Sequence, residues 1–277
     1  MNLTIITDGN LKFGLGHILR SKTLAKFLMK DGHEVELIIL SEINLKTLYV
    51  YNDVVIDVPY EGDFLLTKIN PKSKVIGLDY IGQSNLDLVV NVFDFNRYKG
   101  ANQNTGLKYA IIREDVVSLI EKKIYKRDKV LVMLGSFDKN KYAYDVIRFT
   151  DINKLPTSFI EKEKSIDISF FEYCTHFENP KNLASIMNES AWAISNGGST
   201  MLELMSLGIA VHVLPQTKAE MALAEKIFNQ NALLGVGMPI DVPDNNLIRN
   251  VEIKAQNVVD GFGVNRVVQL IKEVVND

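Results

Sequence analysis

The chain has 277 residues, of which 47% are hydrophobic and 23% are charged, and its formal net charge is −3. This length allows one large or two modest domains with ample core, and the weak negative charge gives no reason to expect nucleic acid or a membrane surface as the main partner. No apolar run approaches the roughly 20 residues that span a bilayer, and the first residues follow a strand pattern rather than that of a signal peptide.

Short apolar runs alternate with helical patterns along the chain, which is typical of a parallel α/β sheet. In the first half, these runs predict strands at residues 3–7, 34–40, 54–58, 74–78, 86–92 and 109–112. The helix after the first strand has apolar residues at a spacing that gives it one buried face, and Gly32 is suited to its C-terminal end.

A polar, charged break at residues 114–127 separates this series from a second one. The second series predicts strands at 129–135, 166–171, 191–195, 209–214 and 233–236, and helices at 142–149, 180–189, 200–207, 218–229, 245–258 and 264–275. We therefore predict two Rossmann-like domains, residues 1–120 and 128–277, with the last helix able to pack back on the N-terminal domain. Ligands of such folds lie at the C-terminal ends of the strands, here in the cleft between the halves.

The turn FGLGHILR carries two glycines and a histidine at the start of the first helix. Gly14 and Gly16 permit positive φ and close backbone approach, and free N–H groups at a helix start favour anions. The third glycine of a dinucleotide fingerprint is replaced by leucine, which argues against NAD. A helix N-terminus disfavours a protonated imidazole, so His17 either stays neutral as a general base or only caps its own turn. Arg20, one turn later, can bind phosphate or pair with a surface acid.

The second signal is SNGGSTMLEL at residues 195–204, a glycine turn between a strand and a helix. Its backbone amides would converge on an anion such as a diphosphate. Thr200 and Glu203 match a capping box, or else Glu203 accepts hydrogen bonds from two ribose hydroxyls. The residues predicted to bind the nucleotide lie in this turn, in the loop after the next strand and at the end of strand 129–135: Ser136, Asn196, Gly197, Gly198, Ser199, Thr200, Glu203 and Gln216.

Polar residues also follow two strands of the first half. Asp79 and Tyr80 come after strand 74–78, where the tyrosine either stacks on a sugar or covers the sheet edge, and Asn91 either binds sugar hydroxyls or forms a turn. With the residues of the opening turn, the predicted substrate-binding set is Gly14, Gly16, Arg20, Asp79, Tyr80 and Asn91. The four histidines are scattered, so we predict no metal site and no cofactor. The single Cys174 excludes an intramolecular disulfide, suits a cytoplasmic location and is more often structural than nucleophilic.

Three segments together resemble a known family: GLGHILR at residues 14–20, GLKYAIIRE at 106–114 and the glycine turn at 195–204. They are similar, in order over most of the chain, to the nucleotide-sugar hydrolases of pseudaminic acid biosynthesis (the PseG type). These are grouped with spore-coat polysaccharide proteins of the SpsG type and share the GT-B architecture of MurG-like glycosyltransferases.

The resemblance implies a GT-B-like fold and a UDP-linked 2,4-diacetamido-2,4,6-trideoxyhexose as substrate. Water would cleave the anomeric bond to UDP with inversion and without a metal. His17 matches the family's catalytic histidine, the base or water-orienting group. The segment around Ser199 and Glu203 matches its nucleotide-binding region.

The chain departs from this family in two places. The family carries a strand-end Asp-His-Tyr motif and a later acidic strand end, whereas here only the LDY at residues 78–80 is present, and a GGTD pattern is changed to GSFD at 135–138. The sugar pocket is therefore altered. Two alternatives stay open: a GT-B glycosyltransferase, which would release UDP only with an acceptor, and a non-catalytic nucleotide-sugar-binding pathway protein. The expected partner is a UDP-sugar, and the oligomeric state is left open.

Overall fold

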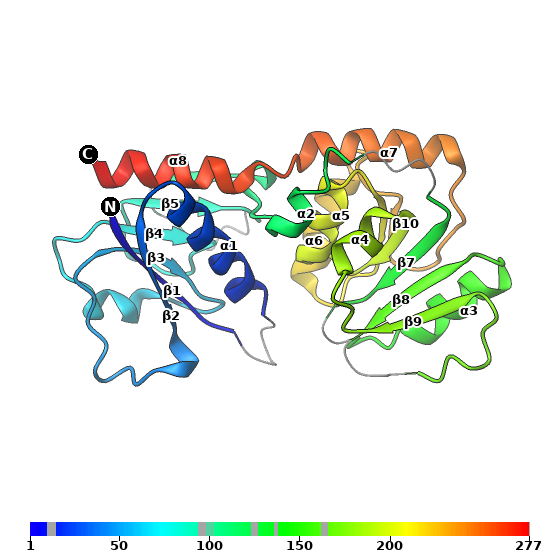
Figure 1. Cartoon of the computed structure of the whole chain (residues 1–277), viewed down its shortest axis with the longest axis horizontal. Coiled ribbons are helices and arrows are strands. Elements are labelled where there is room, and N and C mark those ends of the chain that lie inside the picture. The colour runs from blue at the N-terminus through cyan, green and yellow to red at the C-terminus, as the bar shows by residue number, and fades with distance from the viewer. Residues whose placement is uncertain are drawn as a thin grey trace. The chain divides into compact units, whose positions relative to one another are not determined.

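The computed structural model describes residues 1–9, 15–93, 98, 100, 102–122, 127–135, 138–161 and 166–276. The chain forms two compact units, unit 1 (Met1–Arg113 and Phe262–Asp277) and unit 2 (Glu114–Gly261), and each contains a six-stranded parallel sheet (Figure 1). The predicted site residues Gly14 and Ser136 lie outside the described residues.

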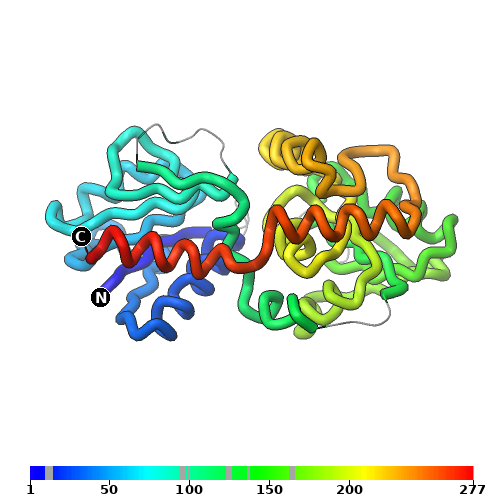
Figure 2. Tube along the Cα trace, turned by 90° about the horizontal axis from the view of Figure 1, so that it is seen from above, coloured from blue at the N-terminus to red at the C-terminus, as the bar shows by residue number. Residues whose placement is uncertain are grey.

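Unit 1 has the strand order β2-β1-β3-β4-β5-β6. Its strands are β1 (Asn2–Thr7), β2 (Glu34–Ile39), β3 (Asp53–Asp57), β4 (Val75–Leu78), β5 (Leu88–Asn91) and β6 (Gln103–Thr105). Its helices are α1 (Gly16–Lys30) and α8 (Gly263–Asn276), with short 3₁₀ turns η1 (Leu40–Glu42), η2 (Asp63–Lys68) and η3 (Leu107–Tyr109). Helix α8 packs against α1, as Figure 2 also shows, so the last helix of the chain helps to cover the first sheet.

The core of unit 1 forms because the central strands are apolar on both faces, as expected for parallel strands covered on both sides. Ile6, Ile56 and Val89 are buried in a cluster that η1, η2 and the long loops cover. Helices α1 and α8 contribute a second set of buried side chains, including Leu24 and Val267. The sheet is thereby held rigidly enough to position side chains at its carboxyl edge.

Unit 2 has the strand order β12-β11-β10-β7-β8-β9. Its strands are β7 (Lys129–Met133), β8 (Thr157–Glu161), β9 (Cys174–Glu178), β10 (Ser190–Ser195), β11 (Ala210–Val213) and β12 (Gly235–Val236). Its helices are α2 (Glu114–Val117), α3 (Ala143–Ile152), α4 (Leu183–Asn188), α5 (Ser199–Ser206), α6 (Lys218–Phe228) and α7 (Asn245–Val258). Among the described residues, no helix is long and apolar enough to span a bilayer.

Two of the strand predictions were wrong. Residues 109–112 form no strand, because the sixth strand of unit 1 is the polar segment Gln103–Thr105, followed by η3. Residues 166–171 form no strand either: Ile168 and Phe171 contact the core from a turn, while β8 and β9 complete the sheet. Strands β6, β8 and β9 were not predicted because their polar residues interrupt the apolar pattern. In β8 the polar residues Thr157 and Ser158 are nevertheless buried.

The order of the strands reverses once in each sheet. In unit 1 the chain runs from β1 to β2 on one side and then to β3 on the other, and in unit 2 β10 lies on the opposite side of β7 from β8. A crevice forms at the carboxyl ends of the strands at such a switch point, because the two connections leave the edge in opposite directions. These two places are therefore where ligand-binding side chains are expected.

Candidate functional site

Four side chains of unit 1 gather at the carboxyl edge next to its switch point. Asp57 is the last residue of β3, Asp79 follows β4 directly, and Asn91 is the last residue of β5. His17 is the second residue of α1, whose N-cap, Leu15, offers no side-chain hydrogen bond. The parallel sheet thus brings together residues that are up to 74 positions apart in the sequence, from position 17 to position 91.

His17 is held by Asp57. The Nδ1 atom of His17 lies 2.6 Å from Oδ1 of Asp57, and the Asp57 side chain is 0% exposed. Because a carboxylate only accepts hydrogen bonds, Nδ1 carries the hydrogen and donates a hydrogen bond to Asp57. In the neutral ring the other nitrogen, Nε2, is then an acceptor. This carboxylate orients the imidazole so that Nε2 of the neutral ring can accept a proton.

Arg20 joins the same network from the next turn of α1. Its Nε atom donates to both carboxylate oxygens of Asp57 at 3.0 and 2.9 Å, and its Nη2 also donates to Asp57. Its Nη1 donates to Oδ2 of Asp79 at 2.5 Å. Ser21 donates a further hydrogen bond to Asp57 at 2.7 Å. Arg20 therefore pairs with two acids at the sheet edge, one of them fully buried, and not with a surface acid.

The charges of this network stabilise one another. Burial alone would raise the pKa of Asp57, but the charge of Arg20, with the hydrogen bonds from His17 and Arg20, holds this pKa well below its usual range. Burial alone would lower the pKa of Arg20, and the charges of Asp57 and Asp79 raise it instead. Both groups are consequently ionised at neutral pH. A buried ion pair of this kind is costly to break, because the remaining charge is left without compensation.

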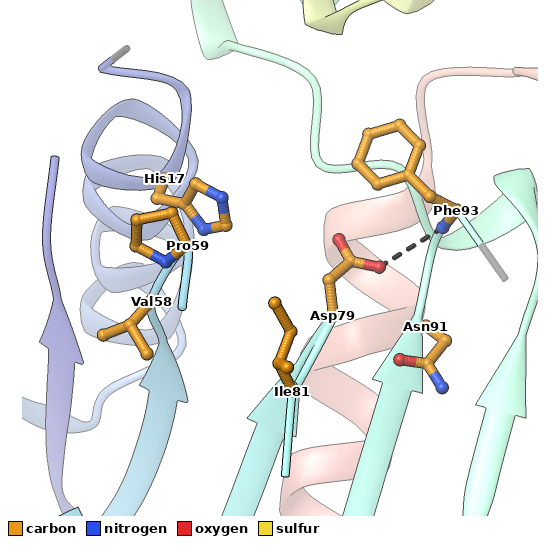
Figure 3. A pocket seen from close by; sticks show the side chains of 7 residues that line it. All are labelled: His17, Val58, Pro59, Asp79, Ile81, Asn91 and Phe93. Carbon is orange, nitrogen blue, oxygen red and sulfur yellow. Dashed lines mark hydrogen bonds between the residues drawn. The ribbon is translucent and has the colours of Figure 1, made fainter. Parts of the chain in front are cut away.

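Asp79 has an unusual backbone conformation. Its φ is +46°, in the left-handed region that costs a non-glycine residue on the order of 1–3 kcal/mol. This conformation directs Oδ1 to the amides of Val92 and Phe93, at 2.7 and 3.2 Å, while Oδ2 accepts from Arg20. Figure 3 shows the contact with the Phe93 amide. Asp79 thus links α1 to the segment after β5.

A pocket opens beside this network. It has a volume of about 160 Å³ and is lined by His17, Val58, Pro59, Asp79, Ile81, Asn91 and Phe93 (Figure 3). Sites for whole drug-sized ligands measure about 300–1,000 Å³, so this pocket suits one part of a larger ligand. Of the predicted residues, the structure brings together His17, Asp79 and Asn91 here, with Arg20 behind them.

Tyr80 is buried, contrary to the prediction that it binds the substrate. Its side chain is 2% exposed and belongs to the core, so no sugar can stack on it in this structure. Three glycines make room for the ring: a Cβ atom at Gly62, Gly77 or Gly82 would lie 2.7, 2.6 or 2.5 Å from Tyr80 atoms. Its hydroxyl donates to Oδ1 of Asp63 at 2.8 Å. Burial, followed by this carboxylate, raises the Tyr80 pKa, so the phenol stays neutral.

In unit 2 the predicted glycine turn lies at the switch point between β7 and β10. Helix α5 begins at Ser199, and its N-cap is Gly198, which has no side chain. The predicted capping box is therefore wrong: Thr200 is already the second helical residue, and Glu203, 8% exposed, lies within the helix. The first turn of α5, which the structure describes completely, carries no acidic side chain. The helix itself therefore places no carboxylate beside its first amides, which can bind an anion.

Glu220 holds this turn in place, although it is not among the site residues predicted from the sequence. Its Oε1 accepts a hydrogen bond from Nδ2 of Asn196 at 2.7 Å, and its Oε2 accepts one from the backbone N–H of Gln216 at 2.6 Å. Gly197 packs closely on Glu220, since a Cβ there would lie 2.8 Å from Cβ and 2.9 Å from the backbone carbonyl oxygen of Glu220. Thr217 and Glu220 do carry the spacing of a capping box, and Thr217 is the N-cap of α6. That signal could have identified Glu220.

Gln216 and two buried atoms complete the turn. The side chain of Gln216 donates from Nε2 to Oδ1 of Asp138 at 3.0 Å, and its Oε1 accepts from the backbone N–H of Asn140 at 3.0 Å. It therefore connects the loop after β11 to the segment after β7. Among the described residues, neither Oγ of Ser195 nor Oδ1 of Asn196 has a hydrogen-bond partner, although both atoms are buried. Buried polar atoms are usually paired, so these two atoms at the end of β10 are exceptions among the described residues.

Asp57 was also missed, although it stood inside a predicted strand. A charged residue within the apolar run VVIDV is a signal, because a buried acid needs a partner. Among the described residues, no group of three or more His, Cys, Asp or Glu side chains could hold a metal ion.

Comparison with known proteins gives a fold and two distant relatives. No protein-family model matches the chain. The spore coat polysaccharide biosynthesis protein SpsG of Bacillus subtilis is 24% identical over an alignment that covers 99% of this chain and 98% of SpsG. An uncharacterized protein of Methanocaldococcus jannaschii is 26% identical over 79% of this chain, which spans 57% of that relative.

Solved structures match over nearly the whole chain. MurG of Acinetobacter baumannii has a TM-score of 0.64 at 13% identity and covers 98% of this chain, which in turn covers 99% of MurG. The glycosyltransferase AviGT4 of avilamycin A biosynthesis has a TM-score of 0.61 at 11% identity, with coverages of 100% and 98%. The fold is of the GT-B type. At these identities the match establishes the architecture, and the chemistry has to be argued from the sites.

Proposed function

We propose that this chain is a nucleotide-sugar hydrolase that releases UDP from a UDP-linked 2,4-diacetamido-2,4,6-trideoxyhexose. The observation that carries the proposal is the orientation of His17, whose Nδ1 donates to the buried Asp57 and whose Nε2 is left as an acceptor beside a pocket. A positioned base of this kind suits the activation of water. The similarity to SpsG, which is named for spore coat polysaccharide biosynthesis, supports a role in sugar chemistry.

In the proposed reaction the oxygen of a water molecule attacks the anomeric carbon while the bond from that carbon to the UDP oxygen breaks. The proton of the water passes to Nε2 of His17, and UDP leaves with the bonding electrons. Attack from the side opposite to UDP inverts the anomeric configuration. The amides of Gly197, Gly198, Ser199 and Thr200 are proposed to bind the diphosphate, because a helix N-terminus stabilises the negative charge of a leaving phosphate.

His17→Ala tests this mechanism. General-base catalysis contributes about 10²–10⁴-fold, so UDP release should fall by at least about 100-fold while UDP still binds in isothermal titration calorimetry. The control is His33→Ala, because His33 lies just beyond the other end of α1 and its Nε2 contacts Asp31 at 3.5 Å. Unchanged UDP release from His17→Ala would remove this residue from the mechanism. Inversion is checked by following the anomer of the released sugar by NMR.

A glycosyltransferase is the second candidate, and one observation favours it. Leu15 and Leu19 are 41% and 45% exposed on the first turn of α1, next to His17. Such apolar surface would suit the body of an acceptor whose hydroxyl His17 deprotonates. The two candidates are separated by following free UDP with and without added acceptors. Release without an acceptor supports the hydrolase, release only with an acceptor supports the transferase, and binding without release supports a non-catalytic protein.

A further inference from the structure

The network behind the pocket carries an excess of negative charge. The single guanidinium of Arg20 pairs with two carboxylates, those of Asp57 and Asp79, so the cluster has a net charge of −1 when His17 is neutral. Among the described residues that line the pocket there is no lysine or arginine. The carboxylate of Asp79, 13% exposed, is the part of the cluster that faces the pocket directly.

The polar atoms that the pocket side chains present to a ligand are hydrogen-bond acceptors. Nε2 of neutral His17 is an acceptor, because Nδ1 donates to Asp57. Asp79 is a carboxylate and can only accept. Asn91 donates from its Nδ2 to Gln103 at 3.0 Å, and Figure 3 shows its oxygen on the side of Asp79 and Ile81. A ligand group that supplies hydrogen-bond donors therefore matches the described side chains of this pocket best.

The remaining lining is apolar. Val58 and Pro59 form one side of the pocket, and Ile81 and Phe93 are the other apolar residues (Figure 3). Apolar walls exclude water and strengthen the electrostatic interactions of the few polar atoms. An anion placed against these described side chains would lose hydration and face the acceptor atoms of His17 and Asp79.

We propose that the pocket beside His17 selects a sugar that offers hydroxyl, amide or ammonium donors and rejects a sugar that carries a carboxylate, with Asp79 as the residue that determines this selection. The proposal rests on the proposed function for the identity of the ligand as a nucleotide sugar. Its physical basis is separate, because a desolvated ligand carboxylate would repel Asp79 and find no donor among these side chains. Neutral and amino sugars would be accepted, and uronic acids would be excluded.

A matched pair of ligands tests this inference on the full chain. UDP-glucose and UDP-glucuronic acid differ only in a hydroxymethyl group and a carboxylate, and their affinities are measured by calorimetry relative to UDP. We expect UDP-glucuronic acid to bind at least about tenfold more weakly than UDP-glucose. Equal binding, or a preference for UDP-glucuronic acid, would overturn the inference.

Asp79→Asn tests the residue. Asparagine tolerates the positive φ of this position and has nearly the same shape, so the variant removes the charge while keeping the backbone. In this variant the ratio of the affinities for UDP-glucose and UDP-glucuronic acid should fall from about tenfold towards one. The control is Asp87→Asn, which removes one charge from the exposed residue just before β5 and should leave the preference unchanged. A preference that survives in Asp79→Asn would contradict the role of Asp79.

A second measurement separates this inference from the proposed function. The ring signals of His17, one of only four histidines, can be assigned by comparison with His17→Ala and followed by NMR. Methyl glucoside at millimolar concentration should shift these signals, and methyl glucuronide should not. If UDP fails to bind but this difference is seen, the proposed function fails and the selection by charge stands. If the two sugars shift the signals equally, the selection fails whatever UDP does.

Discussion

Replacing Asp57 by Asn should destabilise unit 1 strongly. Asp57 is 0% exposed and accepts hydrogen bonds from His17, Arg20 and Ser21. An amide keeps the shape but loses the charge, and its NH₂ group faces donors that need an acceptor. Removing one partner of a buried pair costs about 3–5 kcal/mol, and we expect about 3 kcal/mol because Arg20 keeps Asp79. At about 2–4 °C per kcal/mol, the melting temperature should fall by on the order of 10 °C.

The effect should depend on pH. The pKa of Asp57 is lowered in the folded state, so its charge stabilises the protein above the pKa of the unfolded chain, about 3.9, and this stabilisation is lost as the pH falls further. The part of the difference in unfolding free energy between the wild type and Asp57→Asn that comes from this charge should therefore be fully present well above pH 4. It should shrink below about pH 4.

Urea unfolding followed by far-UV circular dichroism measures this difference. Trp192 is the single tryptophan and lies in β10, so its fluorescence reports on unit 2. Asp87→Asn is the matched control: its partner Lys74 is 3.7 Å away and both side chains are partly exposed, so the loss should stay below about 1 kcal/mol. An Asp57→Asn variant that unfolds at the wild-type urea concentration would refute the stabilising role of the network.

Two further predictions concern residues that we place outside the chemistry. Tyr80→Phe removes the 2.8 Å hydrogen bond to Asp63 and should cost about 1 kcal/mol in urea unfolding without changing UDP release; a loss of release of more than tenfold would return Tyr80 to the substrate site. Burial, with Asp151 and Glu161, raises the pKa of Cys174 to about 11, so at pH 8 its thiol should react with Ellman's reagent about 100 times more slowly in the native than in the unfolded chain. Similar rates in the two states would contradict this.

Local patterns were sufficient where the deciding contacts are local. The alternation of apolar runs and helical periods predicted most strands and helices of two parallel sheets, because parallel strands must be apolar and their crossovers helical. Helix α7 was predicted with its observed bounds, and in the structure Asp244 caps it by accepting from the backbone amides of Asn246 and Leu247, both at 2.8 Å. The glycine turn before α5 could also be predicted, because its residues are consecutive in the sequence.

The sequence by itself thus determined the α/β architecture, His17 as a candidate base and the glycine turn as a candidate anion site. Only the tertiary structure decided which charges meet. Arg20 is 37 positions from Asp57 and 59 from Asp79, and it reaches both because the sheet places β3 beside β4. It also placed Tyr80 in the core and Asp79 at the pocket, although the two are neighbours in the chain. Which side chains meet at the sheet edge depends on the strand order and on the packing of the whole unit. The spacing of residues along the chain does not specify these long-range contacts.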